Sequence, residues 1–184
     1  ELGFHELRTS ERVAQELEKL GYKVRRGVGR TGVVADLGDG EGRCIAIRAD
    51  MDALPILEAN DVAYKSQNDG TMHACGHDVH TTCLLGATKI LKELSNEWEG
   101  TIKLIFQPGE EKNPGGASLL INEGVLQNPS PQAIFALHVN PQLEVGKLSF
   151  RDGKVMASAD EIYITIKSKG GHAAAPHLTS DTIL

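Results

Sequence analysis

Side chains that bind metal ions crowd residues 72–80, which read MHACGHDVH. Thiolate and imidazole ligands together suit zinc and its borderline neighbours. Cys75 and His77 would point about 200° apart on a helix, whereas a loop that bends at Gly76 lets both reach one point. Apolar residues at helical spacing begin at Val79. The stretch therefore predicts a loop that delivers ligands at the start of a helix. His73 and His80 lack a comparable argument and stay outside the predicted site, as does the distant His177.

Three further groups of ligand-type side chains each follow a predicted strand, at residues 44–47, 101–106 and 133–137. In chain order they are Asp50 with Asp52, Glu110 with Glu111, and His138. In open α/β sheets, sites form outside the carboxyl ends of the strands. We therefore predict that these groups meet the Cys75 and His77 loop in one site.

More ligand-type groups converge there than a single tetrahedral zinc needs, which suggests a two-metal site that activates water and polarises a carbonyl. Neighbouring side chains of an extended segment point opposite ways, so one of Glu110 and Glu111 binds metal while the other acts as general base. The alternative for this pair is a solvated loop before Lys112. His138 alone could be a core histidine.

Three other residues have two interpretations each. Asp50 and Asp52 cap the turn after their strand, or they orient a metal ligand. His172 follows two glycines, so it is either a surface loop residue or a hydrogen-bond donor to a developing oxyanion.

The order of elements alternates strands with helices, which favours a mainly parallel sheet covered by helices. Ser10 is the expected cap of a helix that ends at Gly21, and the ligand-bearing helix should run to about Glu97. Residues 160–169 alternate apolar and polar side chains, which predicts a half-exposed antiparallel strand. We place a domain boundary near Met156, between residues 1–155 and 156–184.

Charge and composition exclude several classes of protein. The 184 residues carry a net charge of -6 with 40% hydrophobic and 24% charged residues, an ordinary globular balance without a basic run. Nucleic acid and membrane are therefore not expected partners. Three cysteines without disulfide spacing suit a reducing compartment, so we predict a cytoplasmic protein. The chain starts without Met and stops just after a helix-start signal at residues 179–181, as a truncated sequence would.

The sequence resembles the amidohydrolase branch of the co-catalytic metallopeptidases, which includes N-acyl-amino-acid amidohydrolases, hippurate hydrolases and plant hydrolases of indole-acetic-acid conjugates. The matching stretches, in the family's order, are residues 1–4 (ELGF), 48–55 (RADMDALP), 72–80, 107–111 (QPGEE), 137–138 (LH) and 170–177 (GGHAAAPH). The resemblance implies a three-layer catalytic domain. It also implies that residues from about 156 begin an inserted α+β lid and dimerisation domain.

The same resemblance implies specific roles. The metal ligands are Cys75, His77, Glu111 and His138. Glu110 is the general base, and His172 is the lid histidine that reaches the active site of the partner subunit in a homodimer. The cofactors are two divalent ions per complete subunit (Zn, Mn, Co or Ni). The family's last metal-binding histidine lies downstream of Leu184, and more distant relatives carry His-x-Asp where this chain has Asp50 and Asp52.

These observations predict a metal-dependent amidohydrolase that uses a metal-activated water to cleave the amide bond of small N-acyl amino acids. One alternative is a dipeptidase or exopeptidase of the same fold that acts on short peptides. The other is a catalytically inactive metal-binding fragment.

Overall fold

The computed structural model describes residues 1–38, 41–158 and 160–180. It divides into two compact units, Glu1–Gln142 and Leu143–Leu184, each of which is described by itself. The predicted helix-start signal at residues 179–181 includes Asp181, which lies outside the described residues. None of the helices in the described ranges has the length and apolar character that a membrane span requires.

The first unit is an α/β structure, as predicted. Its helices are α1 (Leu7–Lys19), α2 (His77–Glu93) and α3 (Gly116–Asn122). Its strands are β1 (Lys23–Val28), β2 (Gly32–Leu37), β3 (Cys44–Asp50), β4 (Thr101–Gln107) and β5 (Ala133–Ala136).

The strands form one sheet in the order β1-β2-β4-β3-β5. β3 pairs in parallel with β4 on one side and with β5 on the other. β2 is antiparallel to both of its neighbours, β1 and β4. Four of the five strands therefore run in the same direction and only β2 runs against them. This mixed but mainly co-directional sheet agrees with the expected fold class.

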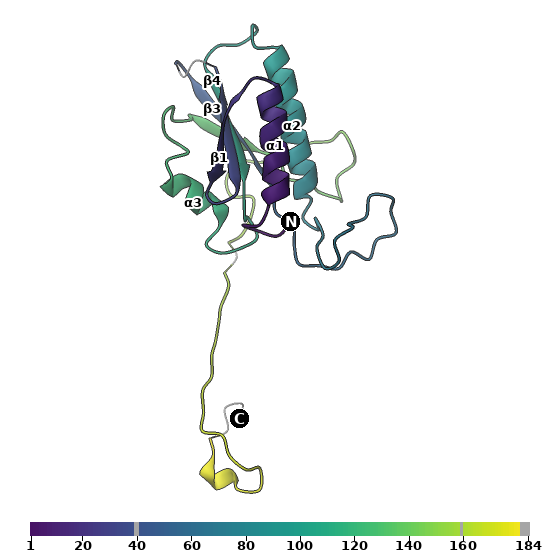
Figure 1. The fold of residues 1–184 in the computed structure, drawn as a ribbon, viewed down its shortest axis with the longest axis vertical. Helices are drawn as coiled ribbons and strands as arrows, with labels where there is room; N and C mark the ends of the chain where they lie inside the picture. The colour runs from purple at the N-terminus through teal and green to yellow at the C-terminus, as the bar shows by residue number, and fades with distance from the viewer. Residues whose placement is uncertain (39–40, 159, 181–184) are drawn as a thin grey trace. The chain divides into compact units, whose positions relative to one another are not determined.

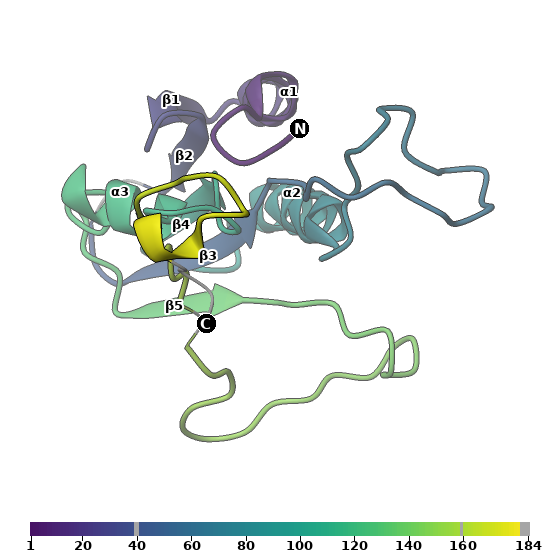
Figure 2. The same cartoon turned by 90° about the horizontal axis from the view of Figure 1, so that it is seen from below.

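Helices cover both faces of the sheet and make three layers (Figures 1 and 2). Leu104 of β4 packs in one core cluster with Leu17 of α1 and Leu84 of α2. Its neighbour Ile105 points the other way and packs with Leu120 of α3. Alternate residues of a strand face opposite sides, so a central strand between two helical layers is expected to be buried on both faces. β4 is accordingly buried along its whole length.

Two predicted helix ends differ from the structure. α1 begins at Leu7, three residues before the expected cap at Ser10. The side chain of Glu1 accepts the backbone N–H groups of Arg8 (2.8 Å) and Thr9 (2.9 Å), so a residue outside the helix satisfies its first turn. α2 ends at Glu93 rather than near Glu97.

The strand predicted at residues 160–169 is absent from the described structure of the second unit. The apolar side of that pattern, Ile162, Ile164 and Ile166, is exposed. Alternation specifies which side chains share a face, but a strand also needs a partner for its backbone hydrogen bonds. The compact units divide after Gln142, and the assignment of residues 1–155 and 156–184 to a catalytic and a lid domain stays a prediction.

Candidate metal centre

The ligand-type side chains of the first unit gather at the carboxyl ends of β3, β4 and β5, beside the start of α2. Asp50 is the last residue of β3, and His77 is the first residue of α2. Glu110 and Glu111 follow the end of β4 at Gln107, and His138 follows the end of β5 at Ala136. Strands that run in the same direction bring their carboxyl ends to one edge of the sheet. The structure thus assembles side chains that lie up to 88 positions apart in the chain, from residue 50 to residue 138.

Three groups of these side chains place their ligand atoms within 4.8 Å of one another. The groups are Cys75, His77 and His138; His77, Glu110 and Glu111; and Asp50, His77 and His80. His77 belongs to all three groups, so it is the centre of the cluster. The first two groups contain only residues that the sequence singled out.

The hydrogen bonds of His77 leave one ring nitrogen free inside the cluster. Its Nδ1 lies 3.2 Å from Oδ1 of Asp52, so the ring donates its Nδ1 proton to that carboxylate. Its Nε2 is buried without a hydrogen-bond partner, 3.5 Å from Oδ2 of Asp50 and 3.9 Å from Oε1 of Glu111. Burial lowers the pKa of His77, but the hydrogen bond with Asp52 and the charges of Asp50 and Asp52 outweigh burial and raise it. The carboxylates around this nitrogen therefore favour a cation, either a proton or a metal ion. This orphaned nitrogen fits a metal ligand.

Cys75 and His138 lie beside His77. The Sγ atom of Cys75 is 3.3 Å from Nε2 of His138, and Nδ1 of His138 donates to the carbonyl of Val139 at 2.8 Å. His138 therefore also directs an unprotonated Nε2 into the cluster. Gly76 adopts φ +82°, and a Cβ atom there would collide with Cγ2 of Val139. The glycine bend predicted from the sequence thus lets the Cys75 loop approach the segment after β5.

His80 joins the cluster but has no free ring nitrogen. Its Nε2 accepts the N–H of Val139 at 2.9 Å, so its proton is on Nδ1, which donates to Oδ1 of Asp50 at 2.6 Å. The other oxygen of Asp50 accepts from Arg48 at 2.8 Å. His80 and Asp50 are therefore committed to hydrogen bonds and hold the segment that carries His138. Sequence reasoning left His80 out, although its position three residues after His77 on one helix face was the available signal.

A model of the family described as peptidase family M20/M25/M40 matches residues 46–182. The chain belongs to this family. Across the whole chain it is 50% identical to the IAA-amino acid hydrolase ILR1-like 4 of Arabidopsis thaliana and 43% identical to the N-acyl-L-amino acid amidohydrolase of Geobacillus stearothermophilus. It spans 41% and 49% of the lengths of these two relatives.

A solved structure of the same family supports the fold. The Bacillus subtilis YXEP protein, described as a dinuclear metal-binding peptidase of the M20 family, matches with a TM-score of 0.73 and 42% identity. The match covers 79% of this chain and 40% of that protein. The expected family and the α/β metallopeptidase-like fold are therefore confirmed.

In this M20 chain the cluster holds excess negative charge. Burial, a hydrogen bond with Glu111 and the nearby carboxylates together raise the pKa of the Cys75 thiol to about 12. Burial and the charge of Glu111 also raise the pKa of Glu110 above its usual range. A bound cation would favour the ionised form of each of these groups. The electrostatics thus agree with the orphaned nitrogen of His77.

Asp52 is ionised and holds two parts of the cluster. Burial alone would raise the pKa of its carboxyl, but hydrogen bonds from His77 and from the backbone of Glu111 and Glu110 outweigh burial and lower it. One oxygen accepts from His77, and the other accepts the N–H of Glu111 at 3.0 Å. The structure therefore places Asp52 where it orients a ligand-type histidine, which was one of its two predicted roles.

One geometric argument from the sequence was wrong. Glu110 and Glu111 were expected to point in opposite directions, yet each offers a carboxylate oxygen within 4.8 Å of His77. The reason is that the chain bends at these residues instead of continuing β4. Both carboxylates therefore face the cluster, and their division into ligand and base stays a prediction.

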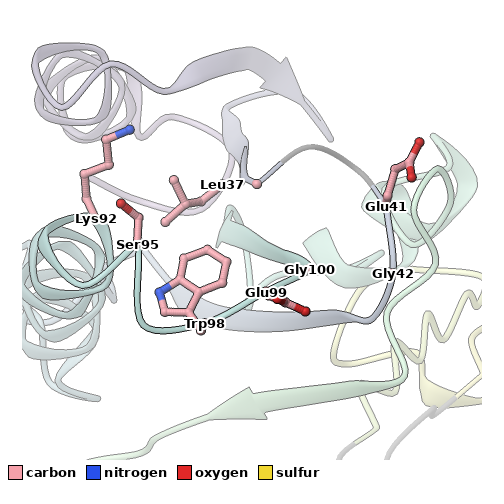
Figure 3. Close-up of a pocket in the computed structure, with 9 residues that line it drawn as sticks. Leu37, Glu41, Gly42, Lys92, Ser95, Trp98, Glu99 and Gly100 are labelled. Atoms are coloured by element: carbon pink, nitrogen blue, oxygen red, sulfur yellow. The ribbon is translucent and has the colours of Figure 1, made fainter.

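Two cavities of the first unit are lined by residues outside the cluster. The larger, of about 610 Å³, is lined by Leu37, Lys92, Trp98 and neighbouring residues (Figure 3). It includes Gly42 and Gly100, which precede β3 and β4, so it lies at the end of the sheet opposite the ligands. A second cavity of about 520 Å³ includes Met51, His73 and Asp78 and lies beside the start of α2.

His172 belongs to the second unit, so its predicted approach to an active site stays a prediction. Its side chain is exposed, and its Nδ1 accepts the N–H of Ala174 at 3.1 Å. The proton of the neutral ring is therefore on Nε2, which can donate a hydrogen bond.

Proposed function

We propose that this protein is a metal-dependent amidohydrolase that cleaves the amide bond of N-acyl amino acids. The observation that carries the proposal is the buried, unpartnered Nε2 of His77, which faces Asp50 and Glu111 beside the thiol of Cys75. Imidazole, thiolate and carboxylate donors together suit divalent transition metals.

Two divalent ions, of Zn, Mn, Co or Ni, are the proposed cofactors. Cys75, His77, Glu111 and His138 would hold them, and their ligand-type atoms lie close together in the two groups that share His77. Bound ions of this kind supply Lewis acidity, which lowers the pKa of water and polarises a carbonyl oxygen. Asp52 would keep the ring of His77 in the tautomer and orientation that coordination needs.

Glu110 is the proposed general base. Its carboxylate accepts a proton from water while the water oxygen attacks the acyl carbon, and it passes that proton to the amine nitrogen as the C–N bond breaks. Bound ions would favour the ionised form of Glu110, which is the form that accepts a proton. His172 is the proposed donor to the developing oxyanion, since its Nε2 carries the ring proton.

The names of two relatives support an acylated amino acid as substrate. One is an IAA-amino acid hydrolase and the other an N-acyl-L-amino acid amidohydrolase. The chain spans less than half of each relative, so the activity of the whole protein is inferred and not observed. We also propose a cytoplasmic homodimer formed through the lid domain, with neither nucleic acid nor membrane as a partner.

A peptidase is the second candidate function, because the structurally similar YXEP protein is described as a peptidase. The comparison of N-acetyl and N-benzoyl amino acids with dipeptides, at equal concentrations and with the same metal, separates the two functions. Faster turnover of the acylated amino acids supports the amidohydrolase. Faster turnover of dipeptides would replace it with a dipeptidase.

Metal content is the first test of the proposal. The complete gene product is purified without chelator and its metal is measured by elemental analysis. We expect about two transition-metal ions per chain. If no metal is present and none is taken up from Mn or Zn solutions, the ligands do not form a metal site and the protein is a relative in fold only.

A further inference from the structure

The carboxylate of Glu6 is fully buried and both of its oxygens are engaged. Its exposed fraction is 0%, although it lies only six residues from the start of the chain. Oε1 accepts the backbone N–H of Gly109 at 2.7 Å, and Oε2 accepts the hydroxyl of Thr31. A buried carboxylate is costly unless hydrogen bonds compensate for lost water. The position of Glu6 is therefore set by these two contacts.

Gly109 is the second residue of the loop that carries the proposed base and ligand, residues 108–111, which we call the Glu110 loop. The N–H of Gly109 is bound by Glu6, and its carbonyl accepts the N–H of Gly116 at 2.9 Å. Gly109 also has φ +51°, a conformation that other residues rarely adopt. Its backbone is thus held on both sides.

The segment that leads to Glu6 packs directly on this loop. A Cβ atom on Gly109 would collide with the ring of Phe4. A Cβ atom on Gly3 would come within 3.2 Å of both the Cα of Gly109 and Oδ2 of Asp52. The absence of side chains at both glycines therefore allows the first residues of the chain to contact the Glu110 loop.

The far end of the Glu110 loop is held in the same way. Asp52 accepts the N–H of Glu111 at 3.0 Å, as Glu6 accepts the N–H of Gly109. Glu110 lies between these two anchored backbone groups. We propose that Glu6 is a positioning residue that fixes the backbone of the Glu110 loop, and so the direction of the Glu110 carboxylate. This inference rests on the proposed function, because it takes Glu110 as the base.

Two substitutions separate positioning from simple filling of space. Glu6→Met keeps a similar volume but removes the acceptor for Gly109, whereas Glu6→Gln keeps an acceptor oxygen and can donate to Thr31. Displacement of a reacting group by about 1 Å can cost 100-fold in rate. We expect kcat of the metal-loaded complete gene product on an N-acetyl amino acid to fall about 10- to 100-fold in Glu6→Met, with KM nearly unchanged. Glu6→Gln should stay within about threefold of wild type.

Tyr22→Phe is the control for the loss of buried hydrogen bonding elsewhere. It removes the bond from the Tyr22 hydroxyl to the carbonyl of Thr88, whereas Glu6→Met removes two bonds. Tyr22→Phe lies outside the proposed site and should leave kcat unchanged. Wild-type kcat in Glu6→Met overturns the proposal. An equal loss of kcat in Glu6→Met and Tyr22→Phe also overturns it, because general destabilisation would then explain both.

Hydrogen exchange tests the hydrogen bond between Gly109 and Glu6 without an activity assay. In the wild type, the amide of Gly109 should exchange slowly despite its place in a loop. Glu6→Met should accelerate exchange of the amides of residues 109–111 without change in β4. Fast exchange of Gly109 in the wild type overturns the proposal even if Glu6→Met does not fold. If the wild type hydrolyses no acylated amino acid but Glu6 protects the Gly109 amide from exchange, the proposed function is wrong and the positioning of the Glu110 loop by Glu6 is still supported.

Discussion

At the scale of single residues, His77 shows how the neighbours of a ligand-type side chain prepare it for a metal. The Nδ1–H of His77 donates a hydrogen bond to Asp52, so Nε2 remains inside the cluster without a hydrogen-bond partner. His80 has the same kind of carboxylate partner, but the N–H of Val139 occupies its second nitrogen. Two histidines on one helix turn therefore differ in role because of one backbone N–H group.

Substitution of the base and of a ligand should have different consequences. Glu110→Gln removes the proton acceptor, so it should abolish turnover while the metal content stays near that of the wild type. His77→Ala and Cys75→Ala remove ligands, so they should lose metal as well as turnover. Elemental analysis and amide hydrolysis are measured on the same preparations. Wild-type rates in Glu110→Gln would rule out its assignment as the base.

Asp52→Ala should weaken metal binding although Asp52 is not a proposed ligand. The loss of a carboxylate that orients a ligating histidine typically costs about 10- to 100-fold in metal affinity. Affinity is measured by competition with a chromophoric chelator. Asp52→Asn keeps an oxygen that can accept from His77, so its loss should be smaller. Equal affinity in wild type and Asp52→Ala would show that the hydrogen bond does not prepare His77.

At the scale of elements, α2 presents the ligand loop and also closes one face of the core. Its buried residues include His77 and His80 near the start and Thr88 further along. Tyr22, just before β1, donates its hydroxyl proton to the carbonyl of Thr88 at 3.1 Å. This contact joins the sheet edge to the same helix that carries His77.

The Tyr22 contact predicts a pH dependence of stability. Burial raises the pKa of Tyr22 to about 12 in the folded protein. A raised folded pKa means that the contribution of Tyr22 is complete below the unfolded value of about 10 and is lost as the pH rises toward 12. Tyr22→Phe should lower the free energy of unfolding by about 1 kcal/mol at pH 7. The difference between the two proteins should shrink between pH 10 and 12.

Urea unfolding at several pH values measures this difference. Tyr64→Phe is the control, because Tyr64 is 87% exposed and should give no pH-dependent difference. A constant difference between wild type and Tyr22→Phe over this range would contradict the prediction.

The turn that starts α2 should be sensitive to a single methyl group. Gly76→Ala places a Cβ atom against Val139 and forces alanine to adopt φ +82°. We expect lower thermal stability and weaker metal binding, because Cys75 and His138 must move apart. Gly70→Ala has a similar φ of +72° but nothing within 4 Å, so it carries only the backbone cost of about 1 kcal/mol. Equal metal affinity in both variants would mean that the close approach at Gly76 has no role in the site.

At the scale of the whole molecule, the described site comes from the first unit alone, while the proposed lid histidine is in the second. The chain spans 41% of the length of one relative and 49% of the other. The oligomeric state of the complete protein is therefore a proposal. The proposed homodimer predicts that His172 of each subunit reaches the active site of the partner subunit.

Dimers that contain one subunit of each of two variants test this prediction. Glu110→Gln and His172→Ala should each be inactive alone. If the two proteins are unfolded together and refolded, a mixed dimer contains one site with an intact Glu110 and an intact His172 from its partner. Random pairing should restore about a quarter of wild-type activity, since about half of the dimers are mixed and each has one complete site. If a mixture shown to contain mixed dimers recovers no activity, His172 either acts in the site of its own subunit or has no role in catalysis.

The sequence by itself determined the parts of this protein that depend on short-range patterns. Runs of apolar residues predicted the strands that end at Asp50 and before Glu110, because a strand buried on both faces is rich in apolar residues. The spacing from Cys75 to Val79 predicted the ligand loop and the start of α2, because Gly76 and the apolar period that follows it are local signals of a helix start. The co-directional strands then brought these groups to one edge.

Only the tertiary structure decided which partners each side chain meets. The contacts of Glu6 with Gly109 and of His80 with Val139 join residues far apart in the chain, and no local pattern encodes them. The bend that turns Glu110 and Glu111 toward His77 follows Gly109, on which the start of the chain packs. The alternating residues 160–169 show the same limit, because a pattern marks a possible strand but a hydrogen-bonding partner must be present to form one.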